Sequence, residues 1–358
     1  MTQNSQIESL LANLIDPITN KPYRYQNLHA DAAALSLDVT LPYPAQSRIA
    51  VVEKQIATAL EPLAAGRKIT VSVASQIISH AAQRGVALIP GIKNIIAVAS
   101  GKGGVGKSTT AANLALALAA EGARVGLLDA DIYGPSQPMM MGVDKVRPES
   151  PDGKTILPVI SHGIQIMSIG FLVDSDQAMV WRGPMVSQAL QQLLNDTRWD
   201  NLDYLIIDLP PGTGDTQLTL AQKVPVTGAV IVTTPQDIAL LDARKGLKMF
   251  EKVGVPILGL VENMAIHICS NCGHAEHIFG EGGGERMAKE YGVTLLGSLP
   301  LDIAIRSATD AGTPSVVSDP DGPVAARYRE LAQRVAVKVA EQAKDFSSKF
   351  PKIVIKNN

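Results

Sequence analysis

The fold of this chain is decided by one stretch, Gly101-Lys102-Gly103-Gly104-Val105-Gly106-Lys107-Ser108-Thr109. It fits the pattern G-x-x-x-x-G-K-[ST], in which backbone N–H groups of a glycine-rich loop and the start of the next helix surround a phosphate. An apolar, β-branched run at residues 94–99 precedes the loop, and helix formers fill residues 108–120 after it. This order predicts a nucleotide site, with Lys107 on the β- and γ-phosphates and Ser108 on a magnesium ion. The pattern does not require the second lysine, Lys102.

Short apolar runs alternate with helical segments from Lys93 onward, which is typical of βαβ units and of a parallel sheet covered by helices on both faces. We expect strands to end near Ala99, Leu128, Ile169, Ile207, Val232, Val261 and Leu299. We expect helices at about residues 108–120, 184–195, 215–223, 237–252, 284–291 and 323–344. The predicted fold class is α/β, a P-loop NTPase with a mostly parallel sheet.

Residues 1–80 show a different pattern and predict a small α+β domain. Apolar side chains alternate along residues 35–41 and 69–73, as in half-buried strands, and recur at helical spacing along residues 49–60, with Ser47 placed to cap that helix. We divide the chain into this domain, a linker at residues 81–92, an ATPase domain at 93–345 and a tail at 346–358.

The composition excludes several classes of function. At 358 residues and 46% hydrophobic content, the chain can build about two packed domains. The 32 Lys and Arg nearly balance the 34 Asp and Glu, so no strong field is available to hold nucleic acid or an anionic membrane. The N-terminus does not resemble a secretory signal, and no apolar run reaches membrane-spanning length. We therefore expect a cytoplasmic protein with neither nucleic acid nor membrane as a partner.

Acidic side chains follow the expected strands at the edge where a parallel sheet binds its ligand. Asp208 ends an apolar run and is placed to hold a magnesium-bound water, while Ser108 binds the metal directly. Asp129 and Asp131 end another run, and Asp131 is placed to orient the attacking water. An aspartate after such a strand can instead cap the helix that follows, and this interpretation fits Asp215 better than Asp208.

The two cysteines of the chain, Cys269 and Cys272, form a C-x-x-C segment near several histidines. An iron–sulfur cluster generally takes four protein ligands, so one such pair per chain suggests that two chains share one cluster. One alternative is a mononuclear zinc site that also uses His274 and His277, although the spacing between Cys272 and His274 is tight for zinc. Another is a thioredoxin-like redox pair.

The loop with Lys102, the Asp129-x-Asp131 segment and the Asp208-x-Pro-Pro-Gly segment together resemble the deviant Walker A class of ATPases, which includes the nitrogenase iron protein, MinD and ParA. The resemblance implies a homodimer in which Lys102 reaches the partner's phosphates. It also implies that the amide of Asn263 reads adenine, the alternative being an asparagine that closes a turn. ATP is favoured over GTP because the nucleotide domain has no N-K-x-D segment.

Within this class, the chain resembles the Mrp/ApbC family of iron–sulfur cluster carriers. The resemblance rests on the cysteine pair after Asn263, on residues 278–283 and on the segment Trp181-Arg182-Gly183-Pro184-Met185. It implies a labile cluster, of the [4Fe-4S] type, shared by two chains, loaded by an upstream scaffold or donor and passed to apo-proteins with ATP hydrolysis. We interpret Arg182 as structural or interfacial. The rival functions are a MinD- or ParA-like positioning ATPase and a nucleotide-binding scaffold with a structural zinc.

Overall fold

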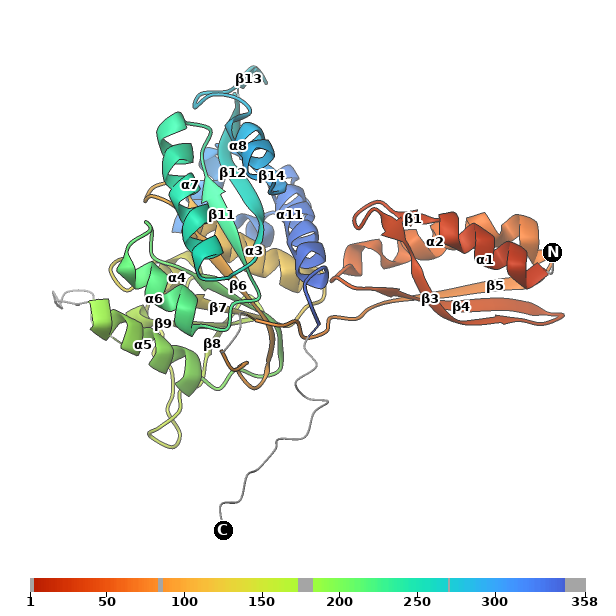
Figure 1. The fold of residues 1–358 in the computed structure, drawn as a ribbon, viewed down its shortest axis with the longest axis horizontal. Helices are drawn as coiled ribbons and strands as arrows, with labels where there is room; N and C mark the ends of the chain where they lie inside the picture. Colours follow the sequence, from red (N-terminus) through yellow and green to blue (C-terminus); the bar gives the residue numbers. More distant parts are fainter. Residues whose placement is uncertain (1–2, 83–85, 173–182, 270, 345–358) are drawn as a thin grey trace, which may run out of the picture.

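A computed structural model describes residues 3–82, 86–172, 183–269 and 271–344. Figure 1 shows a small N-terminal part that projects from a larger α/β part, to which an extended segment joins it. Trp181, Arg182 and the tail at 346–358 lie outside the described residues.

The small part packs two helices on a three-stranded sheet. The helices are α1 (Gln3–Asn13) and α2 (Ile49–Ala64), and the strands run in the order β3 (Arg24–Ala30), β4 (Ala34–Leu41) and β5 (Lys68–Ser75). A short pair, β1 (Ile15–Asp16) and β2 (Lys21–Pro22), follows α1. Alternate side chains of β4 are buried, as are those of α2 at helical spacing, so the two periodicities meet in one core. This confirms the small α+β domain.

The predicted capping role of Ser47 is wrong. Helix α2 follows a 3-10 turn, η1 (Gln46–Arg48), and its N-cap position is Arg48, which makes no side-chain capping bond. The Ser47 hydroxyl instead contacts the carboxylate of Glu121 at 2.7 and 2.9 Å, and the Ser47 N–H donates to the same group at 3.1 Å. Glu121 is only 2% exposed, and a hydrogen bond to a buried carboxylate is stronger than the neutral bond that a capping hydroxyl makes.

The larger part is built on a mostly parallel sheet in the order β13-β12-β11-β6-β10-β7-β9-β8, with β14 paired to β12. β8 and β13 run antiparallel to their neighbours. The strands are β6 (Ile92–Ala99), β7 (Val125–Asp129), β8 (Val159–Ser161), β9 (Ile164–Ser168), β10 (Leu202–Asp208), β11 (Gly228–Thr233), β12 (Ile257–Ile268), β13 (Ala275–Glu276) and β14 (Leu295–Pro300). The predicted α/β class is therefore confirmed.

Helices cover both faces of this sheet (Figure 1). Along the strand order of the sheet, the chain passes from β6 to β7 in one direction. The connections that leave β9, β10, β11 and β12 pass in the opposite direction. Because crossovers between parallel strands are right-handed, the helices of these two sets of connections lie on opposite faces. One face carries α3 (Lys107–Ala120), against which α10 (Ser315–Ser318) and α11 (Pro323–Ala340) pack. The other carries α5 (Gly183–Asp196), α6 (Asp215–Lys223), α7 (Asp237–Lys252) and α8 (Gly283–Tyr291).

Several elements differ from the expectation. β12 continues to Ile268 instead of ending near Val261, because its last residues pair with β13 in a hairpin. α11 ends at Ala340, four residues early. The helices α4 (Gln137–Met140) and α9 (Ile303–Asp310) were not expected. In the described part of the chain, no helix is both long and apolar enough to cross a bilayer.

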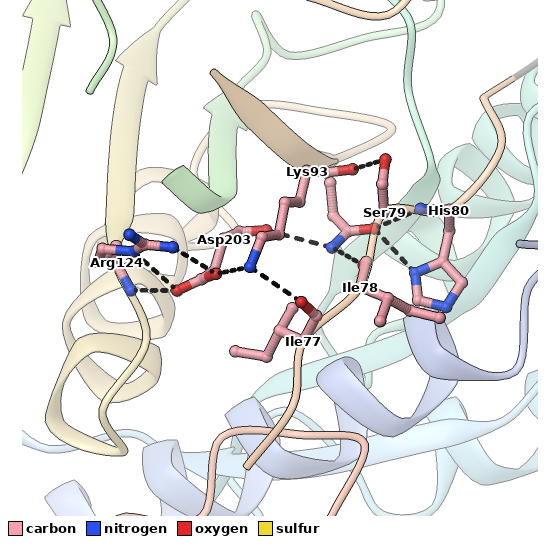
Figure 2. A network of polar contacts seen from close by, with 8 residues as sticks. Ile77, Ile78, Ser79, His80, Lys93, Arg124 and Asp203 are labelled. Atoms are coloured by element: carbon pink, nitrogen blue, oxygen red, sulfur yellow. Dashed lines mark hydrogen bonds and ion pairs between the residues drawn. The ribbon is translucent and has the colours of Figure 1, made fainter. Parts of the chain in front are cut away.

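A polar network fixes the segment between the two parts (Figure 2). Lys93 Nζ donates to Asp203 Oδ1 at 2.7 Å and to the Ile77 carbonyl at 2.9 Å, and the Arg124 N–H donates to Asp203 Oδ2 at 2.9 Å. The buried His80 ring bonds Asn94 Oδ1 through Nδ1 at 2.9 Å. The segment is therefore held at the amino ends of β6 and β10, the edge opposite the glycine-rich loop.

Candidate nucleotide and cysteine sites

The glycine-rich loop between β6 and α3 surrounds a hollow of ≈ 230 Å³. Gly104 and Gly106 have φ values of 80° and 81°, a left-handed conformation that glycine adopts without strain. Lys102, Lys107, Ser108 and Asp131 line the hollow together with Ser100, Gly103, Gly104, Gly106, Thr109, Met140 and Pro211. Its position at the start of α3 suits a phosphate, because the first N–H groups of a helix have no partner within the helix.

Lys107 and Asp208 form a buried ion pair beside the loop. Lys107 Nζ lies 2.6 Å from Asp208 Oδ1 and 3.1 Å from the Ser108 hydroxyl, and the two charged side chains are 6% and 0% exposed. Asp208 ends β10 and stands in register with Asp129 at the end of β7. Burial, with the negative charge of Asp208 added, raises the pKa of the Asp129 carboxyl.

Asp131 stands at the rim of the same hollow. Its N–H donates to Asp129 Oδ1 at 3.1 Å, so the buried carboxylate holds the backbone that carries Asp131. Burial raises the pKa of Asp131. The structure thus brings the loop lysines, Ser108 and the three aspartates together at one edge of the sheet.

Gln137, at the start of α4, is a site residue that the sequence reasoning missed. Its Nε2 donates to Asp208 Oδ2 at 2.9 Å and to the Ser108 carbonyl at 3.0 Å, and its backbone N–H donates to Asp129 Oδ2 at 3.0 Å. The sequence signals for α4 are Ser136 at the N-cap position and Pro138, a residue that favours the first turn of a helix. Nothing in the local sequence marks the contact with Asp208, which lies 71 residues away.

Asn263 lies within β12 and not in a turn. Its Nδ2 donates to the Val105 carbonyl at 2.9 Å, so this strand touches the glycine-rich loop directly. Asn263 also lines a second hollow of ≈ 220 Å³ beside the first, with Gly106, Thr109, Met140, Met264, Pro300, Leu301, Asp302, Ile305, Arg306, Thr309, Asp310 and Tyr328. Asp215, for which a capping role was the alternative, is the first residue of α6, and the N-cap position is Gly214.

The two cysteines lie in the turn that joins β12 to β13. The Cys269 N–H donates to the His274 carbonyl at 2.9 Å, and the Gly273 N–H donates to the Cys269 carbonyl at 2.8 Å. Cys272 is exposed and Cys269 is partly exposed. Hydrogen bonds from the backbone N–H groups of Cys272 and Asn271 lower the pKa of the Cys269 thiol, which favours the metal-binding thiolate.

The nearby histidines make contacts of their own. His277 Nδ1 bonds the Ala265 carbonyl at 2.8 Å, and His267 Nδ1 bonds the Leu301 carbonyl at 3.0 Å. The His274 side chain is 68% exposed, beside Glu276. No group of three or more His, Cys, Asp or Glu that could hold a metal ion occurs among the residues described. The single-chain zinc site stays an alternative hypothesis, which metal analysis would decide.

Comparisons with known proteins match both parts of the chain. Residues 91–336 fit the model of the NUBPL iron-transfer P-loop NTPase, and residues 4–73 fit that of an iron-sulfur cluster assembly protein. An iron-sulfur cluster carrier protein of Pseudomonas fragi is 65% identical over 257 residues, which cover 72% of this chain and 90% of that protein. One of Haemophilus influenzae is 50% identical over 341 residues, which cover 94% and 92%.

A solved structure agrees with these matches. The nucleotide-binding protein of Archaeoglobus fulgidus in complex with ADP is 39% identical, with a TM-score of 0.57, and the match covers 65% of this chain and 90% of that one. The resemblance to the Mrp/ApbC family is thus confirmed. The chain belongs to the NUBPL/Mrp family of iron-transfer P-loop NTPases, which includes the iron-sulfur cluster carrier proteins.

Proposed function

We propose that this protein is an ATP-dependent carrier that holds a labile iron–sulfur cluster on Cys269 and Cys272 and passes it to apo-proteins. The observation that carries the proposal is that one strand, β12, reaches both sites. Asn263 in this strand bonds the glycine-rich loop, and Cys269 directly follows its end. The names of the curated relatives support the cargo. An upstream scaffold or donor would load the cluster, and a reducing cytoplasm would keep both thiols available.

In this proposal the triphosphate of ATP lies against Gly101–Thr109, and adenine enters the second hollow beside Asn263. The Ser108 hydroxyl would bind magnesium and Asp208 would hold a magnesium-bound water, because both groups offer the oxygen atoms that this ion prefers. The geometry supports the fit, because Lys107 Nζ contacts both the Ser108 hydroxyl and Asp208 Oδ1, so these two oxygens surround one point at which a cation already lies. When bound, magnesium supplies positive charge to the phosphate oxygens.

The protein's own side chains then have distinct roles. Lys107 leaves Asp208 and binds the β- and γ-phosphates, and this movement frees one oxygen of Asp208. Asp131, at the rim of the loop hollow, orients the attacking water. Lys102, which lines the same hollow, reaches the phosphates bound by the partner in a homodimer and stabilises the charge that develops there.

The cluster would lie between two chains. The β12–β13 turn exposes one pair of thiols, which is half of the four ligands that a [4Fe-4S] cluster takes, so a second copy supplies the rest. Because both the cluster and Lys102 depend on how two copies meet, ATP binding and cluster binding affect the same dimer interface.

Anaerobic reconstitution with iron and sulfide tests this function. We expect visible absorption from a cluster, about four irons per dimer, and loss of both in Cys269→Ala and in Cys272→Ala. His274→Ala is the matched control, because His274 lies in the same turn but its side chain is exposed, and it should retain the absorption. Sedimentation of the loaded protein should give a dimer. Stoichiometric zinc with no visible absorption would contradict the proposal.

A further inference from the structure

Gln137 is the residue through which three parts of the nucleotide site meet. Its backbone N–H bonds Asp129 at the end of β7, and its side chain bonds Asp208 at the end of β10 and the Ser108 carbonyl in the first turn of α3. The side chain is completely buried. It does not line the loop hollow, so it lies behind the residues that face the phosphates.

The surroundings determine how the Gln137 amide is oriented. Both groups that contact Nε2, the Asp208 carboxylate and the Ser108 carbonyl, are acceptors, so the nitrogen must face them. The opposite orientation would bring three oxygens together without a proton between them. Both N–H groups of the amide are thus used on these two acceptors.

The two oxygens of Asp208 have different partners. Oδ1 accepts from Lys107, and Oδ2 accepts from Gln137. When Lys107 turns to the phosphates, Asp208 loses its cation, but the bond from Gln137 does not depend on Lys107. Gln137 is itself fixed, because its backbone is bonded to Asp129 and its side chain is enclosed. It remains a stationary donor while Lys107 moves.

We propose that Gln137 is a positioning residue that keeps the Asp208 carboxylate in the orientation that binds a magnesium-bound water. This inference rests on the proposed function, since it takes Asp208 as part of the magnesium site. Removal of a hydrogen-bond partner of a metal ligand typically lowers metal affinity about 10- to 100-fold, and Gln137 acts one shell further out, so we expect an effect at the lower end of this range. The geometry therefore assigns to Gln137 a share of the magnesium affinity and none of the affinity for the nucleotide alone.

Calorimetric titration with ADP, in excess magnesium and in EDTA, separates these two quantities. The ratio of the two affinities is the magnesium enhancement. Gln137→Met keeps the length of the side chain but removes both N–H donors, and we expect the enhancement to fall about 10-fold. The affinity in EDTA should change less than about two-fold, which is below 0.5 kcal/mol. A loosened site would instead lose affinity in both conditions, and this result would overturn the proposal.

Two further variants sharpen the test. Ser168→Ala is the control, because the Ser168 hydroxyl contacts Asp129 at 3.2 Å on the neighbouring strand, and the enhancement should persist. If Gln137→Met does not fold, Gln137→Leu makes the same deletion with a good helix former.

Asp208→Asn distinguishes the failure of this inference from that of the proposed function. If Asp208→Asn retains the full enhancement, the proposed magnesium role of Asp208 is wrong. If Asp208→Asn loses the enhancement but Gln137→Met retains it, only the role of Gln137 fails. In the Asp208→Asn background, Gln137→Met should have no further effect, and an equal effect in both backgrounds would refute positioning through Asp208.

Discussion

Gly106→Ala tests the contact between β12 and the glycine-rich loop. Gly106 has a φ of 81°, and a Cβ at this position would overlap Asn263 Nδ2. The new methyl group therefore has to displace Asn263 from the Val105 carbonyl. The substitution thus changes the loop and the candidate adenine-reading residue together, although no phosphate contact is removed.

The expected loss of stability has two sources. A left-handed alanine costs about 1–2 kcal/mol, of which the lower entropy of the unfolded chain offsets about 0.4–1 kcal/mol. Loss of the buried bond from Asn263 to Val105 leaves polar groups unpaired, at a cost of about 1–3 kcal/mol. We expect Gly106→Ala to lower the free energy of unfolding by about 2–4 kcal/mol.

Two other glycines of the loop are matched controls. Gly104 has a φ of 80° but no atom within 4 Å of a built Cβ, so Gly104→Ala should show only the backbone cost, about 1 kcal/mol. Gly103 has neither a positive φ nor a neighbour within 4 Å, and Gly103→Ala should be close to the wild type.

Urea unfolding followed by tryptophan fluorescence provides the assay. Both tryptophans, Trp181 and Trp199, follow the glycine-rich loop in the sequence, so the signal reports the larger part of the molecule alone. The measurement uses nucleotide-free protein, so that stability and binding stay separate. If Gly106→Ala and Gly104→Ala have the same unfolding midpoint and slope, the contact between Asn263 and the loop is refuted.

Three further predictions concern other parts of the chain. Lys102→Ala should lower the rate of ATP hydrolysis about 100-fold or more while ATP binding persists. Lys145 is exposed, so Lys145→Ala is the control in the same assay. A wild-type rate in Lys102→Ala would contradict a role across the dimer. In Cys272→Ser, the rate of Cys269 alkylation should rise with pH around a midpoint below the ordinary thiol value of 9.0, because the backbone donors remain; a midpoint at or above 9.0 would contradict this. Burial lowers the pKa of His80, so the folded state favours the neutral ring. The free energy of unfolding should therefore be at its full value above pH 6.5, the ordinary pKa, and should fall as the pH drops below it. Thermal unfolding measured against pH should show a smaller fall in His80→Gln.

The sequence predicted much of the candidate nucleotide site because the chemistry of such a site restricts the residues. The loop needs glycines at left-handed positions, a lysine for phosphate and a hydroxyl for the metal, and aspartates at the ends of parallel strands necessarily meet at one edge of a sheet. Gln137 could not be predicted in this way. An amide is common in many environments, and the contact that gives it a role is with Asp208, which a separate strand carries.

Ser47 and Asn263 show the same limit. Local spacing favoured Ser47 as a helix cap, but in the folded molecule its hydroxyl and N–H donate to the carboxylate of Glu121, 74 residues later. For Asn263 the family resemblance suggested a role, while the bond to Val105 depends on how β12 lies against the loop.

The sequence by itself determined the α/β class, the phosphate loop, most strand ends and the pair of cysteines, because each follows from local periodicity or from residue types that one chemistry requires. Only the tertiary structure decided that Asn263 of β12 bonds the glycine-rich loop, that Gln137 joins three parts of the site and that Ser47 binds Glu121. These features depend on hydrogen bonds between residues far apart in the chain, and a buried polar group selects its partner from whatever the fold brings within reach.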